Sequence, residues 1–329
     1  MARKILGLVA WPQEYKTQIE AAAQDGGADM VFLPDGIEGD ERNEFILNQI
    51  ADAEMVLGGM MSEAQFLAAR QLKWIHVPWA GVERVLHNRP LVESEVVVTN
   101  AAGVMAGPLA DQVLGYIINH SRKLLAKWDA QKQHEWMRMW DKGQPKELAG
   151  QTVGIIGYGR IGMEIAKRAR VFGMRVIASK RRQGGKYPEL DEVFQSGELG
   201  QLLEQSDYVV VSAPLTEETR GMIGKKELAC MKPGGYFINI ARGALVKENE
   251  LLEALQEGLI AGAALDVFEV EPLSAESPLW DLPNVVITPH SSGNFTGFIR
   301  RTTEFYITNL SRYLNGEPLL NIVDKHSGY

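Results

Sequence analysis

Three ionisable side chains stand shortly after apolar segments in the second half of this 329-residue chain: Arg242, Glu271 and His290. If those segments are parallel strands, their carboxyl ends lie at the edge of a sheet where ligands usually bind. Histidine titrates near neutral pH and can deliver a proton, arginine can stabilise negative charge on oxygen, and glutamate can orient the charged imidazole. Each residue alone also has an ordinary interpretation, as a solvated loop charge or a structural histidine. Together they indicate proton transfer to an oxygen that develops negative charge.

A pattern of the form Gly-x-Gly-x-x-Gly lies directly after the apolar segment Thr152–Ile156 and opens an amphipathic helix predicted over Ile161–Phe172. This strand–turn–helix context favours a dinucleotide site over the alternative, an ordinary βα turn. The first glycine permits a tight turn, the second lets the backbone approach a pyrophosphate, and the third lets helix and strand pack closely. Amides at the helix N-terminus then face the anion. The residues assigned to this site are Gly157, Gly159, Arg160, Ile161 and Gly162.

The residues after the next predicted strand, Arg175–Ala178, indicate which cofactor is bound. An NAD site usually has an Asp or Glu about 20 residues after the glycine pattern, where it binds the ribose 2′-hydroxyl. This chain has a basic run there and no carboxylate until Glu189, and arginine can bind a 2′-phosphate with charge-assisted hydrogen bonds. The run consists of Ser179, Lys180, Arg181 and Arg182. We expect NADP(H) to be preferred, with NAD(H) as the alternative cofactor and a solvated basic turn as the alternative interpretation.

Short apolar segments alternate with amphipathic ones along the first hundred residues, which predicts a parallel sheet covered by helices on both faces. The predicted strands are Lys4–Ala10, Met30–Leu33, Met55–Leu57, Trp74–Val77 and Val96–Thr99. The predicted helices are Gln18–Gln24, Asn43–Ala51 and Glu63–Arg70. These segments are expected to form one small doubly wound domain.

A second series of strands and helices begins at Gln151 with the glycine-pattern strand. Its further predicted strands are Tyr208–Ser212, Tyr236–Ile240, Ala261–Leu265 and Val285–Thr288. Further helices are predicted at Lys247–Glu257 and at Thr303–Leu314. The alternation again predicts an α/β domain with a parallel sheet.

Between the two series, a helix is predicted over Pro108–Ser121 and is expected to continue through Lys123–Trp140. Trp128, Trp136 and Trp140 recur there at multiples of four, a spacing that would place them on one helix face. An exposed apolar face of this kind marks an interface. We expect a subunit interface, and the alternative is that the tryptophans cover the neighbouring domain.

Composition excludes several classes of partner. The formal net charge is −8, whereas nucleic-acid-binding proteins concentrate Lys and Arg. The single cysteine, Cys230, rules out an intramolecular disulfide and fits a reducing compartment. The N-terminal apolar run is too short for a signal peptide, and no run reaches the ~18–20 residues needed to span a bilayer. The histidines are scattered with no H-x-x-x-H pair, so we expect a cytoplasmic protein with no metal, nucleic-acid or membrane partner.

The sequence resembles the D-isomer-specific 2-hydroxyacid dehydrogenases, a family that includes glyoxylate/hydroxypyruvate reductases, D-lactate dehydrogenases and D-3-phosphoglycerate dehydrogenases. The resemblance is strong over roughly Trp74–Gly297 and only general in the first seventy residues. The matching segments are Val98–Ala101, Val153–Gly162, Met231–Gly234, Asn239–Gly243, Ala264–Pro272 and Asn284–His290.

The resemblance implies a fold of two doubly wound parallel-sheet domains. A flavodoxin-like substrate (catalytic) domain would comprise residues 1–99 and 292–329, because the C-terminal helix returns to it. A Rossmann cofactor domain would comprise residues 100–291, with a homodimerisation arm at about 122–141. The family's catalytic Arg, Glu and His would fall on Arg242, Glu271 and His290.

The resemblance also assigns further contacts. Trp79, Ala80 and Gly81 would bind the substrate together with Arg242 and His290, the two amides holding its carboxylate while the tryptophan shapes the pocket. An ordinary turn is the alternative for that loop. Cofactor contacts would extend to Ala213, Pro214, Thr219, Ile240, Ala241, Arg242, Asp266, His290 and Ser292. Many members have a histidine where this chain has Ser212, a change expected to alter cofactor contacts without removing catalysis.

The activity implied is NAD(P)-dependent hydride transfer between the nicotinamide and C2 of a small D-2-hydroxy or 2-oxo acid, of the glyoxylate/hydroxypyruvate reductase type. Formate dehydrogenases of the same superfamily have Gln as the partner of the histidine, so Glu271 argues against formate. Phosphite oxidation uses the same three residue types and is the alternative among enzymes. A nucleotide-sensing protein like the C-terminal-binding-protein co-repressors is the alternative outside enzymes.

Overall fold

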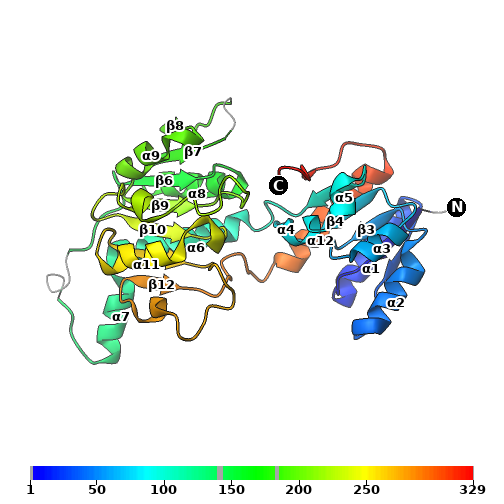
Figure 1. Ribbon diagram of the computed structural model, residues 1–329, viewed down its shortest axis with the longest axis horizontal. Helices are drawn as coiled ribbons and strands as arrows, with labels where there is room; N and C mark the ends of the chain where they lie inside the picture. The colour runs from blue at the N-terminus through cyan, green and yellow to red at the C-terminus, as the bar shows by residue number, and fades with distance from the viewer. Residues whose placement is uncertain (1–2, 139–143, 182–184, 329) are drawn as a thin grey trace. The chain divides into compact units, whose positions relative to one another are not determined.

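The computed structural model describes residues 3–138, 144–181 and 185–328 of the chain, which fall into two compact units. The first unit comprises Met1–Val104 with Phe295–Tyr329, and the second comprises Met105–Asn294. Each unit is built on its own parallel sheet with helices packed on it (Figure 1), which confirms the predicted fold class. The assignment of substrate to one unit and cofactor to the other stays a prediction.

The first unit has a five-stranded parallel sheet in the order β2-β1-β3-β4-β5. Its strands are β1 (Arg3–Gly7), β2 (Ala28–Phe32), β3 (Met55–Leu57), β4 (Trp74–Val77) and β5 (Val97–Asn100). Its helices are α1 (Gln13–Asp25), α2 (Gly39–Ile50), α3 (Glu63–Ala68), α4 (Glu83–Leu86), α5 (Arg89–Glu93) and α12 (Phe298–Leu314). The order reverses between β1 and β3, as it does in doubly wound sheets that bind ligands beyond the carboxyl ends of their strands.

The last helix of the chain completes the first unit by packing beside α1 on the sheet. Aromatic contacts hold it there, since Trp74 of β4 stacks on Tyr306 at 5.9 Å and on Tyr313 at 5.1 Å between ring centroids. Both Trp74 and Tyr306 are buried. Large buried aromatic rings contribute much of the apolar burial in a core, so this contact explains why a distant segment joins the N-terminal sheet.

The second unit has a seven-stranded parallel sheet in the order β12-β11-β10-β9-β6-β7-β8. Its strands are β6 (Thr152–Ile156), β7 (Arg175–Ser179), β8 (Glu192–Phe194), β9 (Tyr208–Val211), β10 (Tyr236–Asn239), β11 (Gly262–Leu265) and β12 (Val285–Ile287). Its helices are α6 (Ala106–Arg122), α7 (Leu124–Lys132), α8 (Arg160–Val171), α9 (Leu199–Gln205), α10 (Lys225–Leu228) and α11 (Glu248–Gln256).

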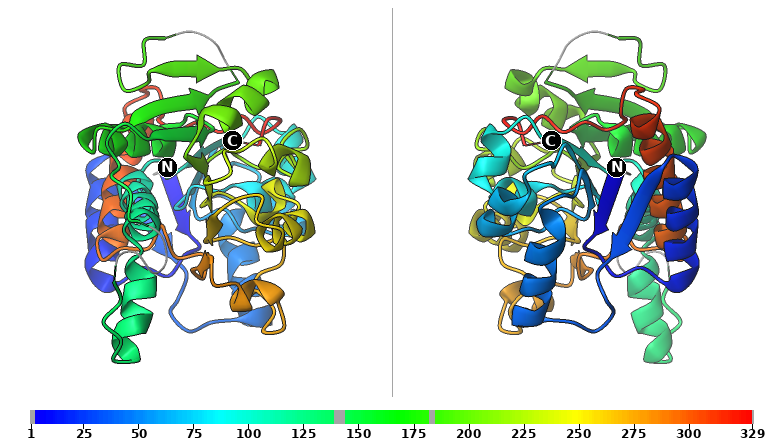
Figure 2. Two further views of the ribbon diagram at one scale, coloured as in Figure 1. Left: turned by 90° about the vertical axis from the view of Figure 1, so that its left-hand side faces the viewer. Right: turned by 90° about the vertical axis from the view of Figure 1, so that its right-hand side faces the viewer.

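Two apolar cores lie on opposite faces of this second sheet. Helices α6 and α8 contribute to one core and α9, α10 and α11 to the other, an arrangement that can be followed in Figures 1 and 2. The apolar stripe predicted on α6 is buried, with Val113 and Ile117 fully shielded from solvent. A parallel sheet needs cover on both faces because its strands are apolar on both sides.

The helix predicted to continue from Lys123 to Trp140 is interrupted, and this prediction is wrong. Lys123 has a φ of +55°, which ends α6 in the left-handed conformation, and α7 then ends at Lys132. Trp136 lies beyond the helix and Trp140 lies outside the described residues. A residue in the left-handed conformation ends a helix, so Trp128 and Trp136 do not share the face of one continuous helix.

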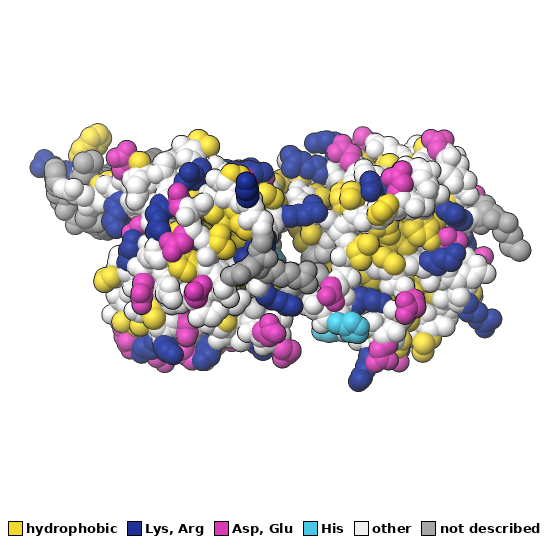
Figure 3. All heavy atoms as spheres, turned by 90° about the horizontal axis from the view of Figure 1, so that it is seen from above, with side chains coloured by type: hydrophobic (Ala, Val, Ile, Leu, Met, Phe, Trp, Pro, Cys, Tyr) yellow, Lys and Arg dark blue, Asp and Glu magenta, His cyan; other side chains and the backbone are white. Residues whose placement is uncertain are grey.

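Charge on the molecular surface is mixed. Acidic and basic side chains are interspersed over the face shown in Figure 3, as expected for a chain whose charged residues include both signs throughout. Among the residues that the structure describes, no helix is both long and apolar enough to cross a bilayer.

Candidate active site

The glycine pattern forms a tight turn between β6 and α8 in which each glycine has a distinct environment. Gly157 has a φ of +94°, and a Cβ there would lie 2.5 Å from the Cα of Ala213. A Cβ at Gly162 would lie 2.9 Å from the carbonyl oxygen of Gly157, whereas one at Gly159 would meet open space. The backbone at Gly159 is therefore open to a ligand at the amino end of a twelve-residue helix, Arg160–Val171. This geometry fits the pyrophosphate of a dinucleotide.

The end of β7 is tied to the same turn. The carbonyl oxygen of Ser179 accepts hydrogen bonds from the amides of Gly157 and Tyr158 at 3.3 and 3.1 Å. Burial, with the Glu189 carboxylate as a second cause, raises the pKa of Tyr158 to about 12. Its hydroxyl therefore stays protonated and donates to Oε2 of Glu189 at 3.2 Å. The basic run thus begins beside the glycine turn.

Residues of the basic run differ in their surroundings. Lys180 is half-buried and donates from Nζ to the hydroxyl of Tyr187 at 2.8 Å. Arg181 is exposed, and Arg182 lies outside the described residues. A cation is therefore present at the end of β7, where a Rossmann fold binds the ribose of the dinucleotide.

The departure from the family pattern at Ser212 has a structural role. Its hydroxyl donates to the carbonyl oxygen of Gly157 at 2.8 Å and so fastens the glycine turn to the end of β9. In the loop that follows, Thr219 donates from Oγ1 to the carbonyl of Pro214 at 2.8 Å. The hydroxyl of Ser212 thus holds the turn through a carbonyl oxygen, so this hydrogen bond occupies no amide of the turn.

The loop after β10 presents Arg242. Asn239, which is buried, donates from Nδ2 to the carbonyl of Arg242 and accepts from the amide of Ala241, both at 3.1 Å. Ile240 and Ala241 are buried within the turn. A Cβ at Gly243 would overlap the backbone of Phe268, so this glycine lets the loop lie directly against the loop after β11. The same loop that presents the arginine is therefore held beside the loop that carries Glu271.

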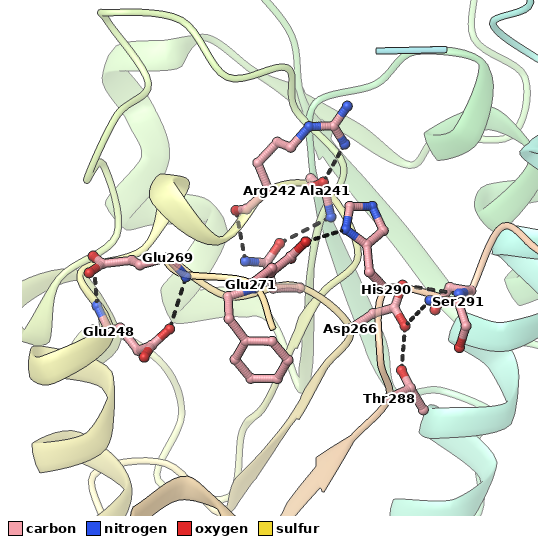
Figure 4. Close-up of polar contacts among 12 residues, drawn as sticks. Ala241, Arg242, Glu248, Asp266, Glu269, Glu271, Thr288, His290 and Ser291 are labelled. Atoms are coloured by element: carbon pink, nitrogen blue, oxygen red, sulfur yellow. Dashed lines mark hydrogen bonds and ion pairs between the residues drawn. The ribbon is translucent and has the colours of Figure 1, made fainter. Parts of the chain in front are cut away.

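Glu271 and His290 contact each other across the loops after β11 and β12. Oε2 of Glu271 lies 2.8 Å from Nδ1 of His290, and Oε1 accepts a hydrogen bond from the amide of Phe268 at 3.0 Å. Figure 4 shows the carboxylate pointing at the imidazole, with Arg242 on the neighbouring loop. The histidine side chain is 50% exposed. Strands β10, β11 and β12 are adjacent in the sheet, which explains how residues distant in sequence meet.

Asp266 supports the turn that carries His290. Its buried carboxylate accepts hydrogen bonds from the amides of Ser291 and Ser292, both at 3.0 Å, and from the hydroxyl of Thr288. Its carbonyl oxygen accepts from the amide of His290 at 2.8 Å. His290 itself has a φ of +49°, an uncommon conformation for a non-glycine residue that the surrounding contacts must hold. The structure thus places Asp266 beneath the turn, with both carboxylate oxygens engaged (Figure 4).

Sequence reasoning missed one support of this turn. The hydroxyl of Tyr116 on α6 lies 2.6 Å from Oγ1 of Thr288 and 3.2 Å from Oγ of the buried Ser292. Tyr116 belongs to the apolar stripe of its helix, and nothing in that periodicity signals a polar contact. Among the described residues, no group of three or more His, Cys, Asp and Glu side chains is arranged to hold a metal ion.

In the first unit, the loop after β4 presents two backbone amides. The carbonyl of Trp79 accepts from the amide of Ala101 at 3.1 Å, and the carbonyl of Ala80 accepts from Nδ2 of Asn100 at 2.7 Å. Within the described part of this unit, the amides of Ala80 and Gly81 donate no hydrogen bond. Two adjacent free donors can bind a carboxylate. Asn100, which the sequence indicated only as part of a matching segment, fixes the loop from the neighbouring strand.

Comparisons of sequence agree with this geometry. Residues 114–292 match the family described as D-isomer specific 2-hydroxyacid dehydrogenase, NAD binding domain. The glyoxylate reductase of Thermococcus gammatolerans is 39% identical over 236 residues, which is 70% of each chain. These matches confirm the predicted resemblance.

Solved structures are similar over nearly the whole chain. A D-isomer specific 2-hydroxyacid dehydrogenase from Xanthobacter autotrophicus Py2, in complex with NADPH and MES, has a TM-score of 0.83 and 31% identity, with 100% of both chains covered. An NADPH-dependent glyoxylate/hydroxypyruvate reductase from Sinorhizobium meliloti, in complex with NADP and sulfate, has a TM-score of 0.81 and 28% identity. That similarity covers 99% of this chain and 100% of the other.

Proposed function

The chain belongs to the D-isomer specific 2-hydroxyacid dehydrogenase family, and from this premise we propose that it reduces small 2-oxo acids of the glyoxylate and hydroxypyruvate type with a nicotinamide cofactor. The observation that carries the proposal is the contact of 2.8 Å between Glu271 and His290 at the same edge of the sheet as Arg242. A bound nicotinamide would supply or accept the hydride at C2. The glycine turn and the end of β7 would hold the dinucleotide.

Side chains of the second unit would stabilise negative charge and donate a proton. Arg242 would bind the substrate carboxylate and the C2 oxygen, stabilising the negative charge that develops on that oxygen. His290 would deliver a proton to the oxygen from Nε2, because Nδ1 is engaged by Glu271. The carboxylate of Glu271 would fix the orientation of the imidazole through Nδ1. In the first unit, the free amides of Ala80 and Gly81 are suited to a substrate carboxylate.

We propose that the substrate carries no charged group besides its carboxylate. The loops at the carboxyl ends of β1, β3, β4 and β5, residues 8–12, 58–62, 78–82 and 101–104, contain no charged side chain. Two cations of the neighbouring helices are already engaged: Arg42 of α2 donates to the carbonyl of Leu8 at 3.5 Å, and Lys16 of α1 pairs with Asp35 in the loop after β2 at 2.7 Å. A phosphate would lack a cationic partner in these loops, and phosphate recognition usually uses Arg or Lys.

We therefore expect glyoxylate and hydroxypyruvate to be reduced with kcat/KM at least about 100-fold above that of 3-phosphohydroxypyruvate, since a desolvated unpaired phosphate costs several kcal/mol. The measurement is initial rates with each acid at saturating NADPH and at saturating NADH. Equal kcat/KM for the phosphorylated acid would contradict the proposed substrate class. Failure to reduce any 2-oxo acid would contradict the proposed function as a whole.

Two alternatives are distinguished by the same assay. Phosphite oxidation would use the same Arg, Glu and His, so phosphite with NAD or NADP belongs in the panel, and we expect no turnover. A nucleotide-sensing protein would bind the cofactor without turning over any acid. The relatives and solved structures named above as reductases and dehydrogenases favour neither alternative.

For the cofactor, we propose a preference for NADPH, supported by the basic run after β7. The double substitution Arg181→Ala with Arg182→Ala should weaken NADPH selectively, by roughly 1–3 kcal/mol in the ratio of KM values, if the charge-assisted bonds have ordinary strength. The measurement is KM for NADPH and for NADH in the parent and the variant. Equal increases for both cofactors would mean that the run does not recognise the 2′-phosphate.

For assembly, we propose a homodimer formed through the arm that contains α7. Figures 1 and 2 show α7 projecting from the body of the second unit, and exposed apolar side chains accompany it, with Trp128 60% and Trp136 93% exposed. Twofold dimers are the commonest symmetric oligomers. Light scattering at micromolar concentration should give twice the monomer mass of 36.5 kDa, and a value at the monomer mass would refute the dimer. The cytoplasmic location stays a prediction.

A further inference from the structure

Lys180 is held by aromatic groups instead of by a carboxylate. Its ammonium donates to the hydroxyl of Tyr187 at 2.8 Å and lies 4.4 Å from the centroid of the same ring. The ring of Tyr158 is 5.9 Å away, and Tyr158 packs edge-on against Tyr187 at 5.4 Å between centroids. The lysine backbone is also anchored, because its amide donates to Phe194 of β8 at 3.0 Å. Both ends of this residue are therefore fixed at the end of β7.

Several other lysines of the second unit are neutralised by carboxylates. Lys167, Lys225 and Lys232 each form an ion pair with a carboxylate. In the part of the chain that the structure describes, Lys180 forms no such pair. The nearby Glu189 is hydrogen-bonded to Tyr158. A cation that is positioned but not neutralised by a carboxylate is a binding group for an anion.

We propose that Tyr187 is a positioning residue that holds Lys180 to bind a phosphate monoester on the ribose of the nucleotide. The proposal rests on the proposed preference for NADPH and names the residue pair that would create it. An ammonium has three N–H donors, so the bond to Tyr187 leaves two for phosphate oxygens. Lysine has large rotamer entropy, and a side chain that is already held loses less of it on binding.

The test measures ligand binding by calorimetry with the full chain, using adenosine 2′,5′-bisphosphate and adenosine 5′-monophosphate. These probes differ in the 2′-phosphate and require no turnover. Tyr187→Phe keeps the ring but removes the hydroxyl acceptor. We expect Lys180→Ala to weaken binding of the bisphosphate about 10- to 100-fold, the range of a charge-assisted hydrogen bond, and Tyr187→Phe to weaken it about 3- to 10-fold, because the lysine remains but is no longer held. Both variants should leave binding of the monophosphate unchanged.

A double variant separates positioning from direct contact. Because Tyr187 acts through Lys180, the combined Lys180→Ala and Tyr187→Phe variant should bind the bisphosphate as weakly as Lys180→Ala alone. Lys186→Ala is the matched control, since Lys186 is an exposed lysine of the same loop with equal charge. A loss in Lys186→Ala equal to that in Lys180→Ala, a further loss in the double variant, or a Tyr187→Phe loss that affects both ligands would overturn the positioning role. A parent that binds both ligands equally would instead overturn the NADPH preference itself.

Discussion

Replacement of His290 by alanine is expected to lower kcat/KM for glyoxylate reduction by about 10²–10⁴-fold, the usual contribution of a positioned proton donor. Glu271 contacts the imidazole at 2.8 Å, and Asp266 holds the turn that carries it. The turn should therefore keep its conformation in the variant, and no other acidic group should move into the position of the imidazole. The measurement is steady-state reduction at pH 7 with saturating cofactor. The loss should appear in kcat as well as in kcat/KM, because the proton is transferred in the reaction and not on binding.

Two controls make this result specific. His87→Ala removes an exposed histidine of the first unit and should leave the rate unchanged. Calorimetry with adenosine 5′-monophosphate should give the same affinity in His290→Ala as in the parent, which would show that the cofactor unit remains folded. A loss below about 10-fold would mean that another group or water donates the proton, and would remove His290 from the proposed catalytic set.

The parts of the molecule that the sequence predicted well are those set by local pattern. The strands at Met55–Leu57, Trp74–Val77 and Thr152–Ile156 have the predicted bounds, because short apolar runs between polar segments define buried parallel strands. The glycine pattern lies in the predicted strand–turn–helix context for the same reason. The contact of Glu271 with His290 followed from placing both residues after strands and from the family resemblance.

The parts that the sequence did not predict depend on distant contacts or on conformations without a residue signature. Lys123 ends a helix with a positive φ, a place where glycine is usual, so the pattern of Trp128 and Trp136 suggested a continuous helix. The short edge strand β8, Glu192–Phe194, has too few residues for a clear alternation. Tyr116 reaches Thr288 across 172 positions of sequence, a pairing that no local pattern encodes.

The substitution Glu271→Gln is expected to lower kcat/KM for reduction by about 10²-fold at pH 8, because it removes the carboxylate that holds Nδ1 of the proton-donating imidazole. The geometry indicates why an amide cannot replace the carboxylate. The amide of Phe268 donates to Oε1, so the carbonyl oxygen of a glutamine would stay there. Its NH2 group would then face Nδ1 of His290, where it opposes a second N–H donor and so disfavours the charged ring.

The loss should appear in kcat, because Glu271 acts through the side chain of His290, which it contacts at 2.8 Å. The measurement is kcat and KM for glyoxylate or hydroxypyruvate at pH 8 with saturating cofactor, in the parent and in Glu271→Gln.

Glu269→Gln is the matched control for this experiment. Glu269 is an exposed carboxylate two positions away that accepts a hydrogen bond from the amide of Glu248, and no dashed line joins it to the imidazole in Figure 4. The Glu269→Gln substitution changes the net charge by the same amount as Glu271→Gln. It therefore measures the effect on the rate of a charge that does not contact His290, an effect that solvent screens strongly. Its kcat/KM should equal that of the parent. If Glu271→Gln also kept the kcat/KM of the parent, or if both variants lost it equally, Glu271 would have no specific coupling to His290 and its assignment as the partner of the proton donor would be wrong.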